Sequence, residues 1–255
     1  MSHSHAHTPF YCEENVYHLI TTLVCTSQKD ASIYAIFISN PQQQVLLFSQ
    51  VASAPEAEYV VWDYHVVAAV FAMDDSDAES AGMVFDLDSK LGLPVPFEEY
   101  VRNTFRPDLY RTGGIIAVLT ELKEPRFRIV PASLFLAHFA SDRSHMLLPS
   151  LPSDRISLAC PQNASYLQPP PPWPPVIGPQ AASRAVKHNL WNRYLDTQYE
   201  EERLDTEGEQ WQAWEDRGDI YGRVIGLKLM SEPHKWRNCF ERGARAPVQT
   251  LQNNR

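Results

Sequence analysis

The stretch YVVWDYHVVAAVF, residues 59–71, is a run of β-branched and aromatic residues typical of a β-strand. A second such stretch, GMVFDLDS at residues 82–89, follows the polar segment MDDSDAES. Because polar residues typical of a loop separate the two stretches, we expect them to form an antiparallel strand pair. The first strand contains His65 and the second contains Asp86, so the pair also carries two side chains that could take part in chemistry.

Helical and strand patterns surround this pair. From Val16 to Val24 apolar residues recur at the i, i+3, i+4, i+7 and i+8 positions, which predicts an amphipathic helix that begins within a residue of Cys12. Residues 32–39 and 44–50 are rich in β-forming residues and predict a hairpin. Further along we expect a short helix at 97–105, a strand at 126–130, a helix at 131–140 and a last strand at 219–230. A helix followed by strands in hairpins indicates an α+β fold with an antiparallel sheet.

The segments outside these elements differ in composition. We expect residues 1–9 to form a disordered tail, in which His3, His5 and His7 could bind a transition metal. Residues 10–255 are expected to form a single catalytic domain that contains two unusual segments. Residues 149–179 hold ten of the 20 prolines and predict an extended loop, and residues 181–217 are expected to be an acidic insertion.

Composition and charge narrow the possible partners and compartment. The formal net charge of −9 argues against binding to nucleic acid or to an anionic membrane. We expect no secretory signal and no membrane span, because the apolar run VVAAVFAM is too short to cross a bilayer. The four cysteines are scattered without a C-x-x-C pair, which suits the reducing environment of the cytoplasm or the nucleus.

The start of the predicted helix favours cysteine chemistry. A helix N-terminus stabilises a thiolate at Cys12, although the neighbouring Glu13 and Glu14 oppose its ionisation. A cysteine nucleophile needs a base, and His65 stands out because it lies inside a predicted strand. If the strands pair so that residue numbers sum to 151, His65 lies opposite Asp86. This register would assemble a Cys–His–Asp triad, whereas a strand histidine with a purely structural role is the alternative.

Several blocks of the sequence resemble one protein family. They run in order from about residue 10 to residue 175: YCEENVYHL, AIFISN, VWDYHVV, VFDLDS, FRIVPASLFLAHFASDRSHM and PPPPWPP. Together they resemble the protein N-terminal glutamine amidohydrolases, and WDYHVV and FASDRSHM are the most specific of them. Beyond about residue 180 the resemblance weakens.

The resemblance implies a monomeric enzyme with a papain- or transglutaminase-like core and its nucleophile at a helix N-terminus. Such an enzyme converts the N-terminal glutamine of a protein or peptide to glutamate, releases ammonia and feeds an N-terminal-residue degradation pathway. It uses no cofactor and no metal. In the matching blocks the family's triad falls on Cys12, His65 and Asp86.

An enzyme specific for an N-terminal residue has to recognise a free α-ammonium, which a carboxylate does well. The substrate-binding candidates lie beside the triad or in the matching blocks: Glu13, Glu14, Asp63, Ser141 and Asp142. For the two glutamates the alternative role is to stabilise the N-terminus of the helix through their negative charge. For Asp142 it is a cap or a salt bridge with Arg143.

Two other functions fit parts of the sequence. A transglutaminase-like acyltransferase would use the same triad but transfer the acyl group to an amine. A non-catalytic interaction protein could present PPPPWPP to proline-binding modules, although the position of this segment among the matching blocks favours packing against the catalytic domain.

Overall fold

A computed structural model of the protein describes residues 7–27, 31–72, 82–111, 124–148, 166–197, 220–234 and 236. Its central unit is a six-stranded antiparallel sheet with the order β6-β5-β4-β1-β7-β8. Its strands are β1 (Ala31–Ser39), β4 (His65–Ala72), β5 (Met83–Phe85), β6 (Val95–Pro96), β7 (Arg126–Pro131) and β8 (Arg223–Gly226). A separate two-stranded sheet is formed by β2 (Val45–Phe48) and β3 (Tyr59–Trp62).

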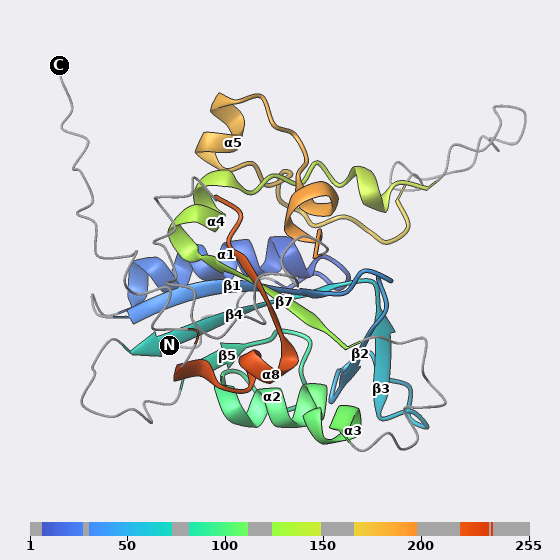
Figure 1. Cartoon of the computed structure of the whole chain (residues 1–255). Helices are drawn as coiled ribbons and strands as arrows, with labels where there is room; N and C mark the ends of the chain where they lie inside the picture. The colour runs from blue at the N-terminus through green and yellow to red at the C-terminus, as the bar shows by residue number, and fades with distance from the viewer. Residues whose placement is uncertain are drawn as a thin grey trace, which may run out of the picture.

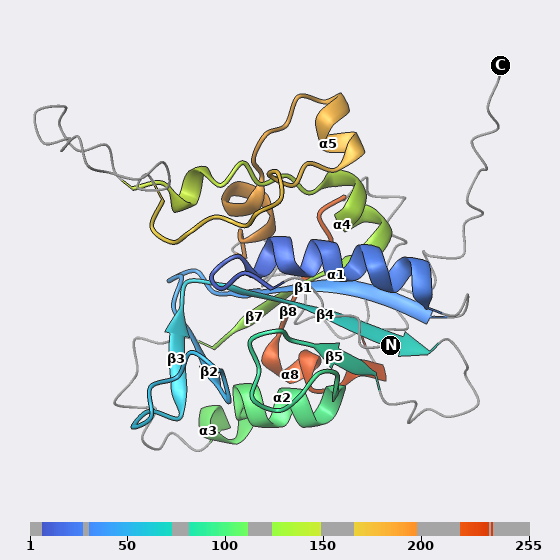
Figure 2. The same cartoon turned by 180° about the vertical axis from the view of Figure 1, so that it is seen from behind.

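Helices cover both faces of the large sheet (Figure 1). The helices α1 (Cys12–Thr26) and α4 (Ala132–His138) lie on one face, and α2 (Phe97–Phe105) and α8 (Leu227–Met230) lie on the other. The view from behind shows the same layers, with β2 and β3 standing at the end of the sheet toward which the N-terminal end of α1 points (Figure 2). The remaining helical segments are α3 (Pro107–Arg111), η2 (Ser144–Met146), α5 (Pro179–Ser183) and η4 (Leu190–Tyr194).

The central strand β1 is apolar on both faces because each face meets a layer of helices. Ile36 and Ile38 belong to the core shared with Phe97 of α2. Phe37, between them in sequence, belongs to the core on the other face, together with Leu19 of α1. The alternation of side chains along a strand therefore divides one apolar run between two cores.

The predicted hairpin of residues 32–39 and 44–50 is wrong. β1 pairs with β4 and with β7, whereas β2 pairs with β3 in the other sheet. After β1 the chain turns at Asn40, whose side-chain oxygen accepts hydrogen bonds from the backbone N–H groups of Gln42 and Gln44. This turn directs β2 away from the sheet that contains β1.

The stretch at 59–71 is two strands and not one. β3 ends at Trp62 and β4 begins at His65, and the carboxylate of Asp63 accepts the backbone N–H of Tyr64 at the break. β4 does pair antiparallel with β5, but in a register where residue numbers sum to 153, such as Ala69 with Val84. The register predicted from a sum of 151 is therefore wrong by two residues. A shift of two residues preserves the face on which each side chain lies.

The other predicted elements are largely confirmed. The first helix begins at Cys12, the helix at 97–105 matches α2, and the strand at 126–130 matches β7. The predicted last strand at 219–230 is in part wrong, since β8 ends at Gly226 and α8 follows.

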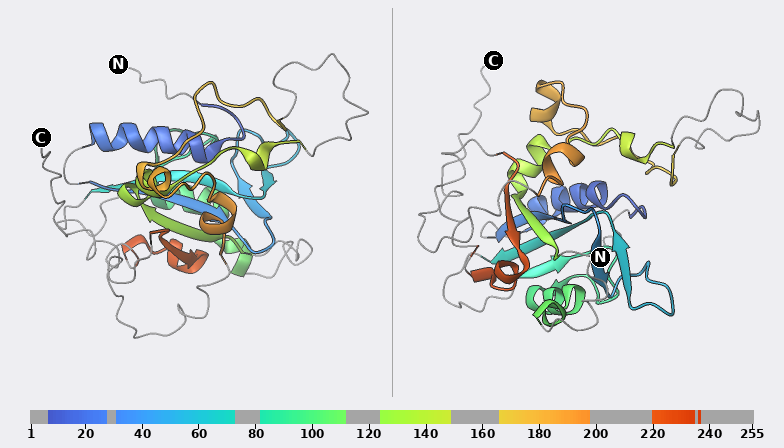
Figure 3. Two further views of the ribbon diagram at one scale, coloured as in Figure 1. Left: turned by 90° about the horizontal axis from the view of Figure 1, so that it is seen from above. Right: turned by 45° about the vertical axis from the view of Figure 1, so that its right-hand side comes forward.

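The terminal and proline-rich segments are described in part. Residues 7–9 depart from the expected disordered tail, because Thr8 exchanges two hydrogen bonds with the side chain of Asn15 in α1. Seen from above, the chain around 166–178 crosses over α1 and α4 (Figure 3). It is fixed there by backbone hydrogen bonds from Ser141 N to Val176 O and from Gly178 N to Phe139 O. Most of the acidic stretch, residues 198–219, lies outside the described part of the chain.

Within the described residues, the helices are too short or too polar to cross a membrane.

Candidate functional site

The site begins at the first residue of α1. Tyr11, fully buried just before the helix, donates a hydrogen bond from its hydroxyl to the carbonyl of Gln168 and so anchors this helix end. The Cys12 side chain is partly exposed, and its sulfur accepts a hydrogen bond from the backbone N–H of Val66. The pairing of β4 with β5 starts only at Ala68, so the β5 ladder does not extend to this end of β4. The short β5 thus leaves the start of β4 open to the cysteine.

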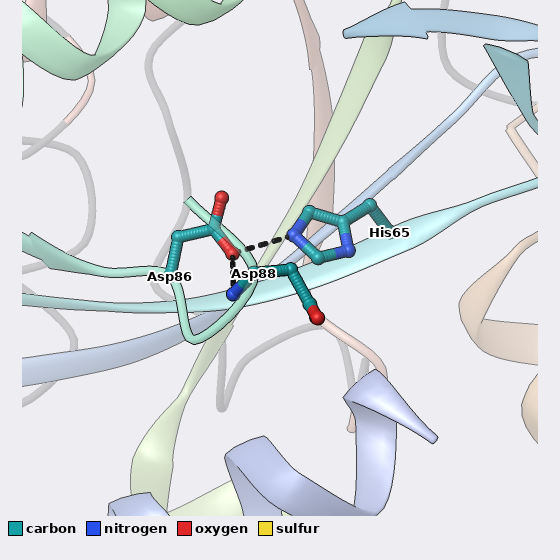
Figure 4. Close-up of side chains that lie close together, drawn as sticks. All are labelled: His65, Asp86 and Asp88. Carbon is teal, nitrogen blue, oxygen red and sulfur yellow. Dashed lines mark hydrogen bonds and ion pairs between the residues drawn. The ribbon is translucent and has the colours of Figure 1, made fainter. Parts of the chain in front are cut away.

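His65, the first residue of β4, forms a buried pair with Asp86, the residue after β5. His65 Nε2 lies 2.9 Å from Asp86 Oδ1, and a dashed line marks this contact in Figure 4. Three further groups donate hydrogen bonds to the Asp86 carboxylate: the Asp88 backbone N–H, the Gln50 amide and the Tyr100 hydroxyl. A carboxylate with four donors is stabilised in its ionised form. The two residues are not directly opposite each other in the ladder between β4 and β5. Asp86 lies just beyond the end of β5, and from there its side chain reaches His65.

The pKa values of this pair move apart. Burial lowers the pKa of His65, but attraction to Asp86 and the hydrogen bond between them outweigh burial and raise it above its usual value. Burial likewise raises the pKa of Asp86, but the charge of His65 and the hydrogen bonds from protein donors leave it below its usual value. These opposite shifts favour an imidazolium beside a carboxylate.

Cys12 and His65 line one cavity of about 320 Å³. Its walls also include two acidic side chains, Asp63 and Asp88, and two indoles, Trp62 and Trp191. The ring of Trp62 lies 4.7 Å from that of His65, centroid to centroid. This volume suits one amino-acid side chain with its backbone.

Glu13 and Glu14 have separate environments although they are neighbours in sequence. Glu13 is completely buried behind Cys12, with its Oε2 3.8 Å from the sulfur and accepting a hydrogen bond from the Tyr64 hydroxyl. Burial, followed by the charge of Glu14 as the next raising effect, brings the pKa of Glu13 to about 7. Burial also raises the pKa of the Cys12 thiol well above its usual value, and Glu13 raises it further.

Glu14 holds the helix to two distant segments. Its carboxylate accepts two hydrogen bonds of 2.7 Å from the Arg143 guanidinium and one of 2.8 Å from the indole of Trp173. Arg143 also donates to the backbone carbonyl of Trp173, within the proline-rich segment. Glu14 is therefore part of a structural ion pair and does not line the cavity.

The other substrate-binding candidates lie in different places. Asp63 lines the cavity beside His65, and its side chain can be reached from solvent. Partial desolvation by the surrounding protein raises the pKa of its carboxyl group above the usual value. Ser141 is fully buried and does not line the cavity. Asp142 is also outside it, where its carboxylate accepts the backbone N–H of Ser144 and lies 3.2 Å from His188 Nδ1.

Several residues of the site carry no signal in the sequence that would single them out. Gln50 and Tyr100 reach Asp86 from a loop and from α2, and His145 approaches Glu13 from η2. Alternation along one continuous strand predicts that Trp62 and Tyr64 point away from His65, but the break at Asp63 and Tyr64 turns Trp62 onto the histidine. Gln50, Tyr100 and His145 are identified only where distant segments meet, and Trp62 only from the local break in the strand.

His65, Asp86 and Asp88 each offer a possible metal-ligand atom, and these atoms lie within 4.8 Å of one another. Hydrogen bonds already engage them: His65 Nε2 is paired with Asp86, and Asp88 Oδ1 lies 3.0 Å from His7 Nε2. The observed contacts fit a hydrogen-bonded His–Asp pair better than a coordination shell.

Comparison with known proteins gives the family. The family model described as N-terminal glutamine amidase matches residues 7–227, which extends past residue 180, where the sequence resemblance was expected to weaken. A protein of Arabidopsis thaliana named protein N-terminal glutamine amidohydrolase is 38% identical over 187 residues, 72% of each chain. A protein of the same name from Drosophila ananassae is 36% identical over 168 residues, 66% of this chain and 69% of its own. The chain therefore belongs to the N-terminal glutamine amidase family.

Proposed function

We propose that the protein hydrolyses the side-chain amide of an N-terminal glutamine in proteins or peptides, giving glutamate and ammonia. The family membership supports the substrate, because the similar plant and fly proteins carry this activity in their names. One structural observation supports the chemistry: Cys12 at the start of α1 lines the same cavity as His65, which is hydrogen-bonded to Asp86. We assign Cys12, His65 and Asp86 as the catalytic triad of a papain- or transglutaminase-like core.

In this mechanism the Cys12 thiolate attacks the side-chain carbonyl carbon of the glutamine. Asp86 holds His65 Nε2, so the other ring nitrogen, Nδ1, exchanges protons with the thiol and the leaving group. The first N–H groups of α1 have no partner within the helix and stabilise the negative oxygen that develops. The C–N bond then breaks, His65 protonates the departing ammonia, and a thioester forms on Cys12. A water molecule activated by His65 hydrolyses the thioester and regenerates the thiol.

We assign recognition of the substrate α-ammonium to Asp63. Its carboxylate lines the cavity, and no lysine or arginine of the described residues is ion-paired with it. The second acidic side chain in the wall, Asp88, already contacts His7. An acetylated or internal glutamine has no ammonium and would leave Asp63 without a charged partner, which disfavours binding.

Replacing Asp63 by asparagine should raise KM for a glutamine-initiated peptide and lower kcat/KM by about 10- to 100-fold, because a charge-assisted hydrogen bond is lost. kcat should change little, since Asp63 does not act on the amide. Steady-state ammonia release measures both constants. Glu56→Gln, an equal change of charge at an exposed site outside the cavity, is the control. An unchanged KM in Asp63→Asn would contradict the assignment.

Replacing Asp86 by asparagine should reduce kcat by about 10³- to 10⁴-fold. Asparagine carries no charge to favour the imidazolium, and its NH₂ group faces donors where the carboxylate accepted four hydrogen bonds. The matched control is Asp142→Asn, which neutralises a carboxylate beside a histidine outside the cavity and should remain active. Equal kcat values in a folded Asp86→Asn variant and in the wild type would refute the role of Asp86.

The proposed function is tested with three peptides of one sequence. Ammonia should be released from the peptide with a free N-terminal glutamine, but not from its acetylated form or from one in which the glutamine is internal. Release from all three would exclude recognition of the N-terminus. If an added primary amine became attached to the peptide in place of hydrolysis, the protein would be a transglutaminase-like acyltransferase.

We further propose a cellular setting for this reaction. An N-terminal glutamate formed from glutamine would feed a degradation pathway that reads N-terminal residues. The scattered cysteines fit the cytoplasm and the nucleus as compartments. A monomer suffices, because Cys12, His65 and Asp86 come from one chain.

A further inference from the structure

We infer that Glu13 must be protonated for Cys12 to become a thiolate, so that ionisation of Glu13 switches the nucleophile off. This inference rests on the proposed function only in taking Cys12 as the nucleophile. It concerns a carboxyl group that the mechanism above does not use.

The carboxyl group of Glu13 has direct contact with the sulfur. Its Oε2 lies 3.8 Å from Cys12 Sγ and 3.0 Å from the Tyr64 hydroxyl, which donates to it. The side chain is 0% exposed, so no bulk water separates it from the thiol. The other oxygen, Oε1, makes no hydrogen bond within the described residues. Hydrogen bonds from its own backbone N–H, the Tyr64 hydroxyl and the Cys12 thiol favour the ionised form, but burial outweighs them and raises the pKa of Glu13.

No cation among the described residues balances a negative charge on Glu13. Arg143 is already paired with Glu14, to which it donates two hydrogen bonds of 2.7 Å. His145 Nε2 lies 3.6 Å from Glu13 Oε1, but burial and the adjacent His188 lower the pKa of His145 to about 4. The titratable and charged groups that face Glu13 are Cys12 and Glu14 of α1, Tyr64, His145 and, further off, Tyr11 and Arg143.

Two negative charges at this distance in a buried site repel strongly, so the Glu13 carboxylate and the Cys12 thiolate exclude each other. When Glu13 is neutral, the thiol proton can move to His65 and the thiolate forms beside an imidazolium. When Glu13 is ionised, the proton stays on the sulfur. With a pKa of about 7 for Glu13, this change falls in the physiological range.

The test measures alkylation of Cys12 by iodoacetamide between pH 6 and pH 8, with the modified Cys12 peptide quantified by mass spectrometry. In the wild type the rate should fall about tenfold over this range, as the neutral fraction of Glu13 falls from roughly nine-tenths to one-tenth. In Glu13→Gln, which cannot ionise, the fall should disappear, and labelling at pH 8 should be about tenfold faster than in the wild type. Identical pH profiles in the two proteins would overturn the inference.

A second variant keeps the test decisive if Glu13→Gln does not fold. Tyr64→Phe removes a hydrogen bond that favours ionised Glu13, so the fall in labelling should move to higher pH. An unmoved profile would also overturn the inference. Glu56→Gln, the same substitution at an exposed position, should keep the wild-type profile. The assay needs no substrate, so a protein with the expected profile but no ammonia release would contradict the proposed function and leave this inference intact.

Discussion

Cys12→Ala is expected to abolish ammonia release from a glutamine-initiated peptide, with a loss in kcat on the order of 10⁴-fold or more. Alanine leaves no group that can form the thioester, and the remaining site can only bind and polarise the amide. Binding should survive, because Asp63 and the rest of the cavity wall are unchanged. The measurement combines ammonia release with isothermal titration of the uncleaved peptide.

The matched control lies on the same helix. Cys25, near the C-terminal end of α1, is exposed, and Cys25→Ala should keep full activity. Together the two variants separate loss of the nucleophile from loss of any thiol on α1. If Cys12→Ala released ammonia at the wild-type rate, the Cys–His–Asp mechanism would be wrong, and a water molecule activated by another group would have to replace it.

Arg143→Ala is expected to lower the free energy of unfolding by about 3–5 kcal/mol. It would leave the Glu14 carboxylate, 0% exposed, without its cation and with only the Trp173 indole as a partner. It would also remove donors to the backbone carbonyls of Pro171 and Trp173, which fix the proline-rich segment over α1. Urea unfolding followed by circular dichroism measures the change.

The double variant Glu14→Gln/Arg143→Ala distinguishes an unpaired charge from lost packing. Because glutamine carries no charge, the double variant should be more stable than Arg143→Ala alone. Arg193→Ala is the control, since this exposed arginine lies over the ring of Tyr221 and should cost less than about 1 kcal/mol. A double variant as unstable as the single one would mean that the charge of Glu14 is not the cause.

Local patterns predicted the longer helices α1, α2 and α4 well, although the residues of α8 were predicted to be a strand. The apolar periodicity after Cys12 marks the start of α1, and the stretch at 97–105 corresponds to α2 without any change of boundary. Helical hydrogen bonds join residues four apart, so the information that specifies a helix lies within a few turns of sequence. The positions of most strands were also predicted locally, from runs of β-branched and aromatic residues.

Strand partners were not predictable in this way. The hairpin expected between residues 32–39 and 44–50 does not form, and β1 pairs instead with β4 and with β7, which is distant in sequence. The register of β4 and β5 differs by two residues from the predicted one. A long loop does not determine register, and each pairing depends on which apolar faces the helix layers can bury.

The amino-acid sequence indicated which chemistry is available: a cysteine at a helix start, a histidine in one predicted strand and an aspartate in the next. It did so because residue type and short-range periodicity are local properties. The two neighbouring glutamates differ because of their tertiary contacts: Glu14 pairs with Arg143, whereas Glu13 is buried against Cys12 with no balancing cation in the part of the chain that the structure describes. The charge state of a buried carboxyl group depends on the partners that distant segments bring to it.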